Sequence, residues 1–273
     1  YASSLRSMQR YLGKKDFPFI KLSSRIISDY QGKLLASGIC DNTIGFYLHN
    51  IKALFRKGCR EMGLELPCPF RDISIKTEKT LKRSLDPVVI KTLSAIELEK
   101  DSPLSLARDI FMFSFYTRGM SFVDIALLKK RHVFPGEICY RRHKTDQLMR
   151  VGINKEISRI LERYKNVPGE YIFPLFPAER DPYAGYRNAY HRIRYSLGKI
   201  SRVIGLEFPL RLHAARHSWA TIAKVNGASV HVIGECLGHT SEKTTRIYLK
   251  ELDHSALDAV NNQVADFILA VDD

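Results

Sequence analysis

The chain has 273 residues, of which 45% are hydrophobic and 26% charged, a composition typical of a globular protein long enough for two domains. Lys and Arg outnumber Asp and Glu by 43 to 29, and the formal net charge of +14 favours a polyanionic partner. The sequence excludes a membrane-spanning segment, because no apolar run approaches the required length, and its scattered, odd-numbered cysteines exclude a disulfide framework or a cysteine-bound metal.

The first 70 residues predict a small all-helical module. Apolar side chains recur at helical spacing in three stripes, which are Leu5, Met8 and Leu12; Leu22, Ile26, Ile27, Tyr30 and Leu34; and Ile44, Tyr47, Leu48, Ile51, Leu54 and Phe55. The third helix also carries four basic residues, Lys52, Arg56, Lys57 and Arg60. These either follow a phosphate backbone or form a solvated helix face, and the pattern leaves both readings open.

A polar, basic segment separates this module from the rest of the chain. Pro67 and Pro69 end the helical pattern, and residues 71–84 predict an extended linker that can pass along a nucleic acid. Asp86 then caps a new helix, with Pro87 in its first turn. We therefore expect a helical domain with its linker over residues 1–84 and a second domain over residues 85–273.

The second domain opens with helical patterns over residues 88–99 and over the strongly apolar residues 110–116, which must be buried. Arg118 follows the buried helix immediately. A charged side chain in this position needs either an ion-pair partner, for which Asp124 is the candidate, or a cleft that binds anions.

A small β-hairpin interrupts the helices. After Arg131 the pattern changes, so that residues 137–142 and 148–153 predict two strands joined by a turn with Lys144 near its tip. A lysine in such a turn is ordinarily just solvated. Helical patterns resume at residues 154–164 and 183–204. We expect a mainly α protein with a small β-sheet, in which an all-helical first domain precedes an α+β second domain.

The helix over residues 183–204 interleaves basic and aromatic side chains, namely Tyr186, Arg187, Tyr190, Arg192, Arg194 and Lys199. This mixture suits a nucleic-acid groove. It also suits an ordinary amphipathic helix with a tyrosine-rich buried side, and the sequence does not decide between the two.

Residues 210–250, LRLHAARHSWATIAKVNGASVHVIGECLGHTSEKTTRIYLK, hold the strongest indication of chemistry. Apolar spacing predicts a helix over residues 212–225, on which His213 and Arg216, three residues apart, project together. Ser229 then caps a second helix.

That second helix ends at Gly238, which places His239 just beyond a helix terminus. Thr240 or Ser241 caps a third helix, and Tyr248 lies about two turns along it. Two histidines, an arginine and a tyrosine are thus carried by short, rigid elements.

These four side chains suit attack on a phosphodiester. The guanidinium of Arg216 matches two phosphate oxygens, and histidines supply further donors. Ionising a tyrosine at pH 7 costs about 4 kcal/mol, given its usual pKa near 10, and a cluster of positive donors lowers that cost. The same donors stabilise the charge on a pentavalent phosphorane, by roughly 3 to 4 kcal/mol each in comparable sites.

At these residues the sequence resembles the tyrosine site-specific recombinases, the phage-integrase-like family. The family's His-x-x-Arg, Leu-Gly-His and nucleophilic tyrosine read here as His213 to Arg216, Leu237 to His239, and Tyr248. The resemblance implies a core-binding domain followed by an integrase-type catalytic domain. It also implies attack by Tyr248 on DNA, a covalent 3′-phosphotyrosine and a free 5′-hydroxyl. Neither metal, ATP nor any other cofactor is implied, consistent with the lack of a P-loop motif.

The chain departs from the family at one position. Aligning Asp124 with the acidic residue of the usual Gly-x-Arg-x-x-Glu pattern places Ser121, not arginine, in the arginine slot. We expect Arg118, about one helical turn earlier, to reach the same phosphate with Asp124 in support. Arg142 and Arg150 are the alternatives.

The family also places a lysine in the hairpin as the general acid for the 5′-oxygen, which assigns that role to Lys144. The reaction needs such a donor, because arginine does not readily give up a proton. We expect His213 and His239 to assist through hydrogen bonding and proton transfer. The expected catalytic residues are Arg118, Lys144, His213, Arg216, His239 and Tyr248.

The resemblance implies double-stranded DNA as the partner, a homotetramer on two DNA sites, accessory DNA-bending proteins and no membrane. It places the protein in the cytoplasm of a bacterial-type cell, with the nucleoid, and a mobile-element integrase is the expected member. Apolar spacing predicts a helix over residues 256–271, which either docks onto a neighbouring protomer, as in the family, or packs on its own domain.

Three other functions fit parts of this pattern. His213 and His217 have the spacing of a zinc site, but Ala214 stands where such a site needs glutamate. The helix pair that follows fits a noncatalytic helix-turn-helix regulator, which leaves Tyr248 unexplained. A type IB topoisomerase uses similar chemistry but relaxes DNA without joining different duplexes.

Overall fold

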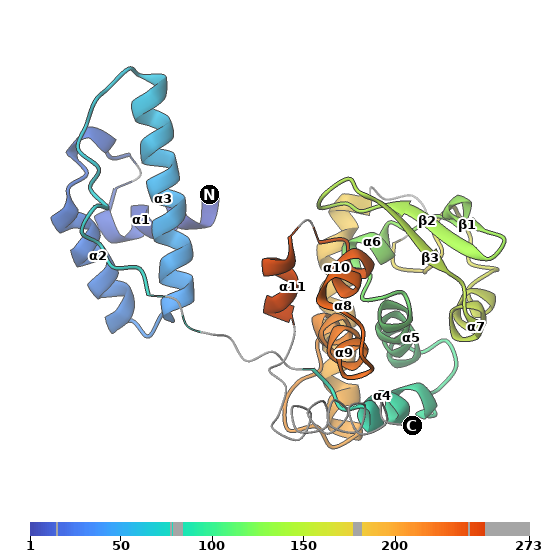
Figure 1. Cartoon of the computed structure of the whole chain (residues 1–273). Helices are drawn as coiled ribbons and strands as arrows, with labels where there is room; N and C mark the ends of the chain where they lie inside the picture. Colours follow the sequence, from blue (N-terminus) through green and yellow to red (C-terminus); the bar gives the residue numbers. More distant parts are fainter. Residues whose placement is uncertain (15, 77, 79–83, 177–181, 240, 249–273) are drawn as a thin grey trace, which may run out of the picture. The chain divides into compact units, whose positions relative to one another are not determined.

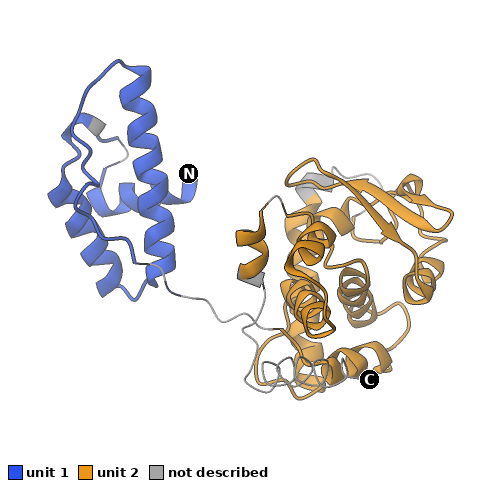
Figure 2. Ribbon diagram, viewed as in Figure 1, with its two compact units in different colours: residues 1–81 blue, residues 82–273 orange. Residues whose placement is uncertain are grey.

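The computed structural model describes residues 1–14, 16–76, 78, 84–176, 182–239 and 241–248. The chain divides into two compact units, residues 1–81 and residues 82–273 (Figures 1 and 2). Each unit has a hydrophobic core of its own. The helix expected near the carboxyl end, over residues 256–271, lies outside the described residues.

Unit 1 is helical throughout its regular structure. Its elements are α1 (Ala2–Leu12), a 3-10 turn (Phe19–Lys21), α2 (Ser24–Ala36) and α3 (Asp41–Glu61). Both α1 and α2 pack against α3, whose buried side chains include Ile44, Leu48, Ile51 and Phe55. Most of the third predicted stripe therefore faces the core, and three of the four basic residues of α3, Arg56, Lys57 and Arg60, are exposed.

The stripe predicted on α1 is only partly right. Met8 is buried, but Leu5 is exposed, and Ser4 and Ser7 are buried instead. The hydroxyl of Tyr30 donates to Ser7 Oγ at 2.8 Å, and the amide of Asn50 donates to Ser4 Oγ at 3.0 Å. Hydrogen bonds to two serines thus satisfy polar groups that would otherwise be costly to bury.

The segment after α3 is fastened to unit 1 as far as residue 78. Gln31 Nε2 donates to the carbonyl of Ser74 at 2.9 Å. Asn42 exchanges two hydrogen bonds with the backbone of Glu78, both at 3.0 Å. The first half of the expected linker therefore follows unit 1. On the other side, the amide of Leu85 donates to Ser218 Oγ at 2.7 Å.

Unit 2 contains the remaining elements. Its helices are α4 (Pro87–Ala95), α5 (Pro103–Tyr116), α6 (Phe122–Ala126), α7 (Lys155–Arg163), α8 (Pro182–Val203), α9 (Leu212–Val225), α10 (Val230–Leu237) and α11 (Glu242–Tyr248), and a 3-10 turn spans Lys130–His132. The apolar helix α5 packs against α4, α7, α8 and α9, and Ile110, Phe111 and Phe113 on it are fully buried. In Figure 1 the sheet lies on one side of α5 and α9 on the other. The core therefore forms around α5.

The capping residues expected from the sequence begin and end these helices. Asp86 Oδ1 accepts from the amide of Val88 at 2.8 Å at the start of α4. Ser229 Oγ accepts from the amide of Val232 at 3.3 Å at the start of α10, and Gly238 ends that helix with φ 63°. Such caps satisfy backbone groups that have no partner within the helix.

The sheet has three antiparallel strands in the order β1 (Val133–Phe134), β2 (Glu137–Arg141) and β3 (Leu148–Gly152). Ile138 pairs with Val151 and Tyr140 with Met149, so alternate residues of the hairpin are buried. The hairpin predicted from the sequence is confirmed. The two-residue strand β1 is an additional element that the sequence does not predict.

The fold is mainly α with a small sheet, as the sequence predicts. Among the described residues, no helix has both the length and the apolar character that crossing a membrane requires.

Candidate active site

A cavity of about 430 Å³ in unit 2 brings together residues from four separate parts of the chain. It is lined by Ser114, Gly119, Met120, Ser121, Phe122, Val123, Arg142, Lys144, Tyr186, Tyr190, Leu212, His213 and Arg216. Three of these side chains are cationic at neutral pH and none is a carboxylate. A cleft lined by one sign of charge concentrates the opposite sign, so the cavity is built for an anion.

The side chain of Arg216 lines this cavity and is buried, with 5% of its surface exposed. Its Nη1 donates to the carbonyl of Gly119 at 2.9 Å, and its Nη2 donates to the carbonyl of Leu237 at 2.5 Å. The two carbonyls come from the turn after α5 and from the end of α10. They hold the planar guanidinium in one orientation while it still lines the cavity.

Gly119 permits this arrangement sterically. Its φ is 75°, a conformation that favours glycine. A Cβ at this position would lie 2.5 Å from Cγ, 2.7 Å from Cβ and 2.8 Å from Cα of Arg216. The turn after α5 therefore approaches α9 more closely than any residue with a side chain allows.

His239 is bonded to the same arginine. Arg216 Nη2 lies 2.9 Å from His239 Nε2, and His239 Nδ1 lies 3.0 Å from Thr245 Oγ1. Because a guanidinium can only donate, Nε2 must accept, which places the imidazole proton on Nδ1 and makes Thr245 its acceptor. The geometry thus selects a neutral imidazole.

Electrostatics favours the same neutral form. Burial, and after it the positive charge of Arg216, lowers the pKa of His239 to about 4. Arg142 and Lys144 act in the same direction with smaller effects. A histidine with this pKa stays uncharged at neutral pH and accepts a hydrogen bond from the guanidinium.

Thr245 joins α11 to the site. It is fully buried, and a Cβ added to Gly234 on α10 would lie 2.9 Å from its Oγ1. The two helices therefore pack closely at a glycine, and the threonine hydroxyl faces His239. Tyr248, the last residue of α11, follows three residues later in the same short helix. The structure describes its backbone, while its side chain lies outside the description.

The hairpin turn supplies the other two cations. Arg142 Nη1 donates to the carbonyl of Gly238, which ties the turn to the end of α10. Asp124, buried with 5% exposure, accepts from the amide of His143 at 2.8 Å through Oδ1 and from Ser121 Oγ at 2.6 Å through Oδ2. This carboxylate fixes the turn to α6, and Lys144 is the next residue along.

Aromatic rings form another part of the cavity lining. Tyr186 and Tyr190 of α8 are stacked with ring centroids 6.4 Å apart and planes at 19°. Each also lies 5.5 Å from the ring of Phe122. The two tyrosines pack against Phe122, as expected for the buried side of an amphipathic helix, and they also line the cavity, so both interpretations of α8 stay open.

The structure does not bring every expected residue into the cavity. Arg118 is half-buried in a left-handed conformation, φ 60°, at the turn between α5 and α6, and it is not among the lining residues. Arg150 is exposed on β3, 3.6 Å from Glu137. His217 is buried with its ring centroid 4.7 Å from that of His213. Among the described residues, no group of three His, Cys, Asp or Glu side chains is placed to hold a metal ion.

Sequence reasoning does not single out Gly119, Gly234 or Thr245. A glycine directly after a buried helix signals a turn, and Gly119 has that signal. The other two carry no local sign of their role, because it depends on how α10 and α11 pack together.

The chain matches the phage integrase family over residues 84–254, more than half its length, and belongs to that family of tyrosine recombinases. It is a site-specific DNA recombinase, an enzyme that cleaves and rejoins DNA. This family assignment agrees with the cationic cavity. It does not agree with the two alternatives of a zinc site or a noncatalytic regulator.

Two relatives illustrate the similarity. Tyrosine recombinase XerC of Shewanella oneidensis is 26% identical over 226 residues, which cover 79% of this chain and 70% of the relative. Tyrosine recombinase XerD of Pseudomonas putida is 36% identical over 94 residues, 32% of this chain and 30% of the relative.

Solved structures share the fold at lower identity. The Tn1549 transposon integrase in complex with transposon right end DNA has a TM-score of 0.71 at 15% identity, covering 97% of this chain and 93% of the other. A lambda integrase dimer bound to a COC′ core site has a TM-score of 0.69 at 18% identity, covering 93% and 89%.

Proposed function

We propose that Tyr248 attacks a phosphodiester of double-stranded DNA held in the cavity of Arg216, Arg142, Lys144 and His213. The phenolic oxygen forms a bond to phosphorus, and the bond from phosphorus to the 5′-oxygen breaks. The products are a 3′-phosphotyrosine and a 5′-hydroxyl, and the reverse reaction with another 5′-hydroxyl rejoins the strand. The observation that carries this proposal is a cavity with three cations, no carboxylate in its lining and α11 joined to it through Thr245 and His239.

Each side chain has a role that its chemistry supports. Arg216 presents donors to the non-bridging oxygens, where charge increases in the transition state. Lys144 protonates the leaving 5′-oxygen, and His213, an exposed residue of the cavity lining, exchanges a proton with the phenol. His239 acts through Arg216, because its Nε2 accepts from that guanidinium.

For the second arginine the geometry favours Arg142. Ser121 lines the cavity at the slot where the family has arginine, and the guanidinium of Arg142 lines the same cavity from the hairpin. Arg118 remains the prediction made from the sequence, and its charge does act on the nearby hydroxyl of Tyr140, lowering that group's pKa against the larger effect of burial. Arg150 is the weakest candidate, because it points to Glu137 on the strand.

DNA binding and assembly follow from the same proposal. Unit 1 is proposed as the core-binding domain, in which exposed Arg56 and Arg60 on α3 face the phosphate backbone. Two structural neighbours are described as a lambda integrase dimer on a core site and a lambda integrase tetramer on a Holliday junction. We propose a homotetramer on two DNA sites in a bacterial-type cytoplasm, with accessory DNA-bending proteins as further partners.

The test is the trapping of a covalent adduct on a nicked suicide duplex that carries the mapped cleavage site. Wild type should form an adduct that survives denaturation, and Tyr248→Phe should form none. Tyr47→Phe, which removes a hydroxyl from unit 1, should behave as wild type. An adduct that persists in Tyr248→Phe, or a peptide map that places the linkage elsewhere, refutes the proposal. Strand exchange between two duplexes then separates a recombinase from a topoisomerase.

A further inference from the structure

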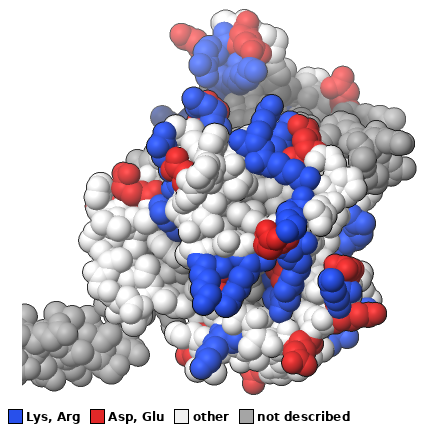
Figure 3. Space-filling view, turned by 90° about the vertical axis from the view of Figure 1, so that its right-hand side faces the viewer, with Lys and Arg blue, Asp and Glu red and all other residues white. Residues whose placement is uncertain are grey.

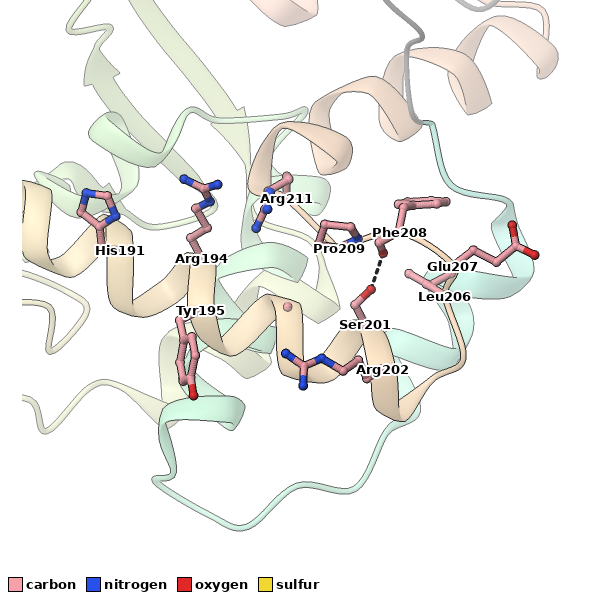
Figure 4. A pocket seen from close by; sticks show the side chains of 11 residues that line it. His191, Arg194, Tyr195, Ser201, Arg202, Leu206, Glu207, Phe208, Pro209 and Arg211 are labelled. Atoms are coloured by element: carbon pink, nitrogen blue, oxygen red, sulfur yellow. Dashed lines mark hydrogen bonds between the residues drawn. The ribbon is translucent and has the colours of Figure 1, made fainter. Parts of the chain in front are cut away.

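A second and larger cavity, of about 620 Å³, lies beside the candidate active site. It is formed by the second half of α8 and the segment that leads into α9 (Figure 4). Its lining consists of His191, Arg194, Tyr195, Gly198, Ser201, Arg202, Leu206, Glu207, Phe208, Pro209 and Arg211. None of the roles proposed above uses it.

Neighbouring residues line the two cavities. Tyr190 lines the active-site cavity and His191 the second one. Arg211 lines the second cavity, and His213, two residues later, lines the first. The two cavities are therefore adjacent along α8 and along the segment that leads into α9.

The second cavity carries an excess of positive charge. It contains three arginines and one carboxylate, Glu207. No ion pair joins Glu207 to Arg194 or Arg202 in the part of the chain that the structure describes, and both arginines are exposed. In Figure 4, Arg194 and Arg211 extend on one side of α8, and Arg202 lies on the other with Tyr195. All three arginines line the same cavity.

Several other cations of unit 2 have a carboxylate partner. Figure 3 shows the face of the sheet and α7, where acidic side chains lie among the basic ones. There Arg159 pairs with Glu156 at 2.9 Å, and Lys129 pairs with Glu170 at 2.9 Å. The second cavity has three arginines to one carboxylate, and Glu207 forms no ion pair with Arg194 or Arg202 among the described residues, so it keeps more positive charge for an anion than these paired cations do.

The walls of the cavity are already in place. Ser201 Oγ donates to the carbonyl of Phe208 at 2.5 Å, and the amide of Leu206 donates to the carbonyl of Ser201 at 2.9 Å. These bonds hold the segment after α8 against the helix. Gly198 leaves free space in the cavity lining, because a Cβ there would meet no atom within 4 Å. A site that needs little ordering binds its ligand at lower entropic cost.

We propose that this cavity binds a backbone phosphate of the DNA near the one that is cleaved. At 1.5 Å per helical residue, Arg194 and Arg202 lie about 6 and 18 Å along α8 from Tyr190. One strand carries a phosphate about every 3.4 Å of duplex axis, so a strand that follows α8 places the bound phosphate roughly two to five nucleotides from the reacting one. The inference rests on the proposed function, because it takes DNA in the first cavity as given. It adds a phosphate-binding site that sets the register of the strand.

The salt dependence of DNA binding tests this inference. In a Tyr248→Phe background, the affinity for a linear duplex is measured by fluorescence anisotropy at several salt concentrations. Replacing both Arg194 and Arg202 by Gln should make the slope of log K against log salt less steep by about 0.9 for each phosphate that the protein no longer neutralises. The matched control, Arg159→Gln with Lys165→Gln, removes two charges that are already paired on α7 and the residues just after it, and it should leave the slope unchanged.

A second pair of variants keeps both arginines. Gly198→Glu places a carboxylate in the free space of the cavity lining, and Gly198→Gln places an uncharged side chain of the same shape there. Glu should weaken binding about tenfold relative to Gln, because a like charge near the phosphate repels it. An unchanged slope in the arginine variant, an equal change in its control, or equal affinities of the Glu and Gln variants each overturn the inference.

The two proposals fail in distinguishable ways. The binding measurements use a protein without the Tyr248 hydroxyl, so they do not depend on cleavage. If the slope changes as expected but wild type never forms an adduct, the phosphate site stands and the chemistry proposed for Tyr248 falls. If adducts form and the slope does not change, only the second cavity loses its role.

Discussion

Gly119 offers the sharpest test of the site, because two measurable costs follow from replacing it with alanine. The backbone conformation, φ 75°, costs about 1 to 2 kcal/mol for a residue with a Cβ. The new methyl group would lie 2.5 to 2.8 Å from three atoms of Arg216, whereas carbon atoms prefer about 3.5 to 4.0 Å. One of the three is Cα, so a change of rotamer cannot relieve the clash and α9 must shift by about 1 Å.

We expect Gly119→Ala to lower the free energy of unfolding by about 2 to 5 kcal/mol, the sum of the backbone strain and of overpacking at roughly 1 to 3 kcal/mol. A misplacement of about 1 Å at Arg216 should slow adduct formation about 100-fold. Gly136→Ala is the control, because Gly136 has φ 83° but a Cβ there would meet no atom within 4 Å. It should show only the strain energy and cleave normally. Urea unfolding and single-turnover adduct formation measure both quantities. Equal cleavage rates in the two variants would refute the reasoning.

Two further predictions concern the charges around Arg216. Arg142→Gln should slow adduct formation by about 10²- to 10³-fold, as loss of a transition-state donor does, whereas Arg150→Gln should change the rate little. If Arg118→Gln greatly slows adduct formation and Arg142→Gln does not, the sequence-based assignment of Arg118 is correct instead. A histidine NMR titration should place the pKa of His239 near 4, and Arg142→Gln should raise it. Because the unfolded chain binds more protons between about pH 4 and 6.5, the free energy of unfolding should fall as pH drops through that window. A His239 midpoint near 6.5 would contradict this.

Local signals in the sequence determine most of the fold of unit 2. The apolar spacing of residues 212–225 and the caps at Asp86 and Ser229 predict helices that the structure contains, because each depends on neighbours a few residues away. The prediction that Leu5 faces the core is wrong, because burial on α1 depends on residues that are distant in the sequence. The buried side of α1 is set by hydrogen bonds from Tyr30 and Asn50, which come from other helices.

The same distinction applies to the site. His213 and Arg216 are recognisable because they are three residues apart in one helix. The hydrogen bond from Arg142 to Gly238 joins residues 96 apart, and that from Arg216 to Gly119 joins residues 97 apart. Spacing along the chain carries no information about such pairs, which is why the sequence alone selects neither the second arginine nor Gly119.

The hydrogen bond between Thr245 and His239 has a consequence for the control of DNA cleavage. If α11 moves away, the imidazole of His239 loses its acceptor, while the carbonyls of Gly119 and Leu237 still hold Arg216. We expect a protomer whose tyrosine is withdrawn to lose the fixed orientation of His239 as well, so that departure of the nucleophile also changes the imidazole beside Arg216. Such coupling between α11 and His239 would protect a chromosome from being cut by a partly assembled complex.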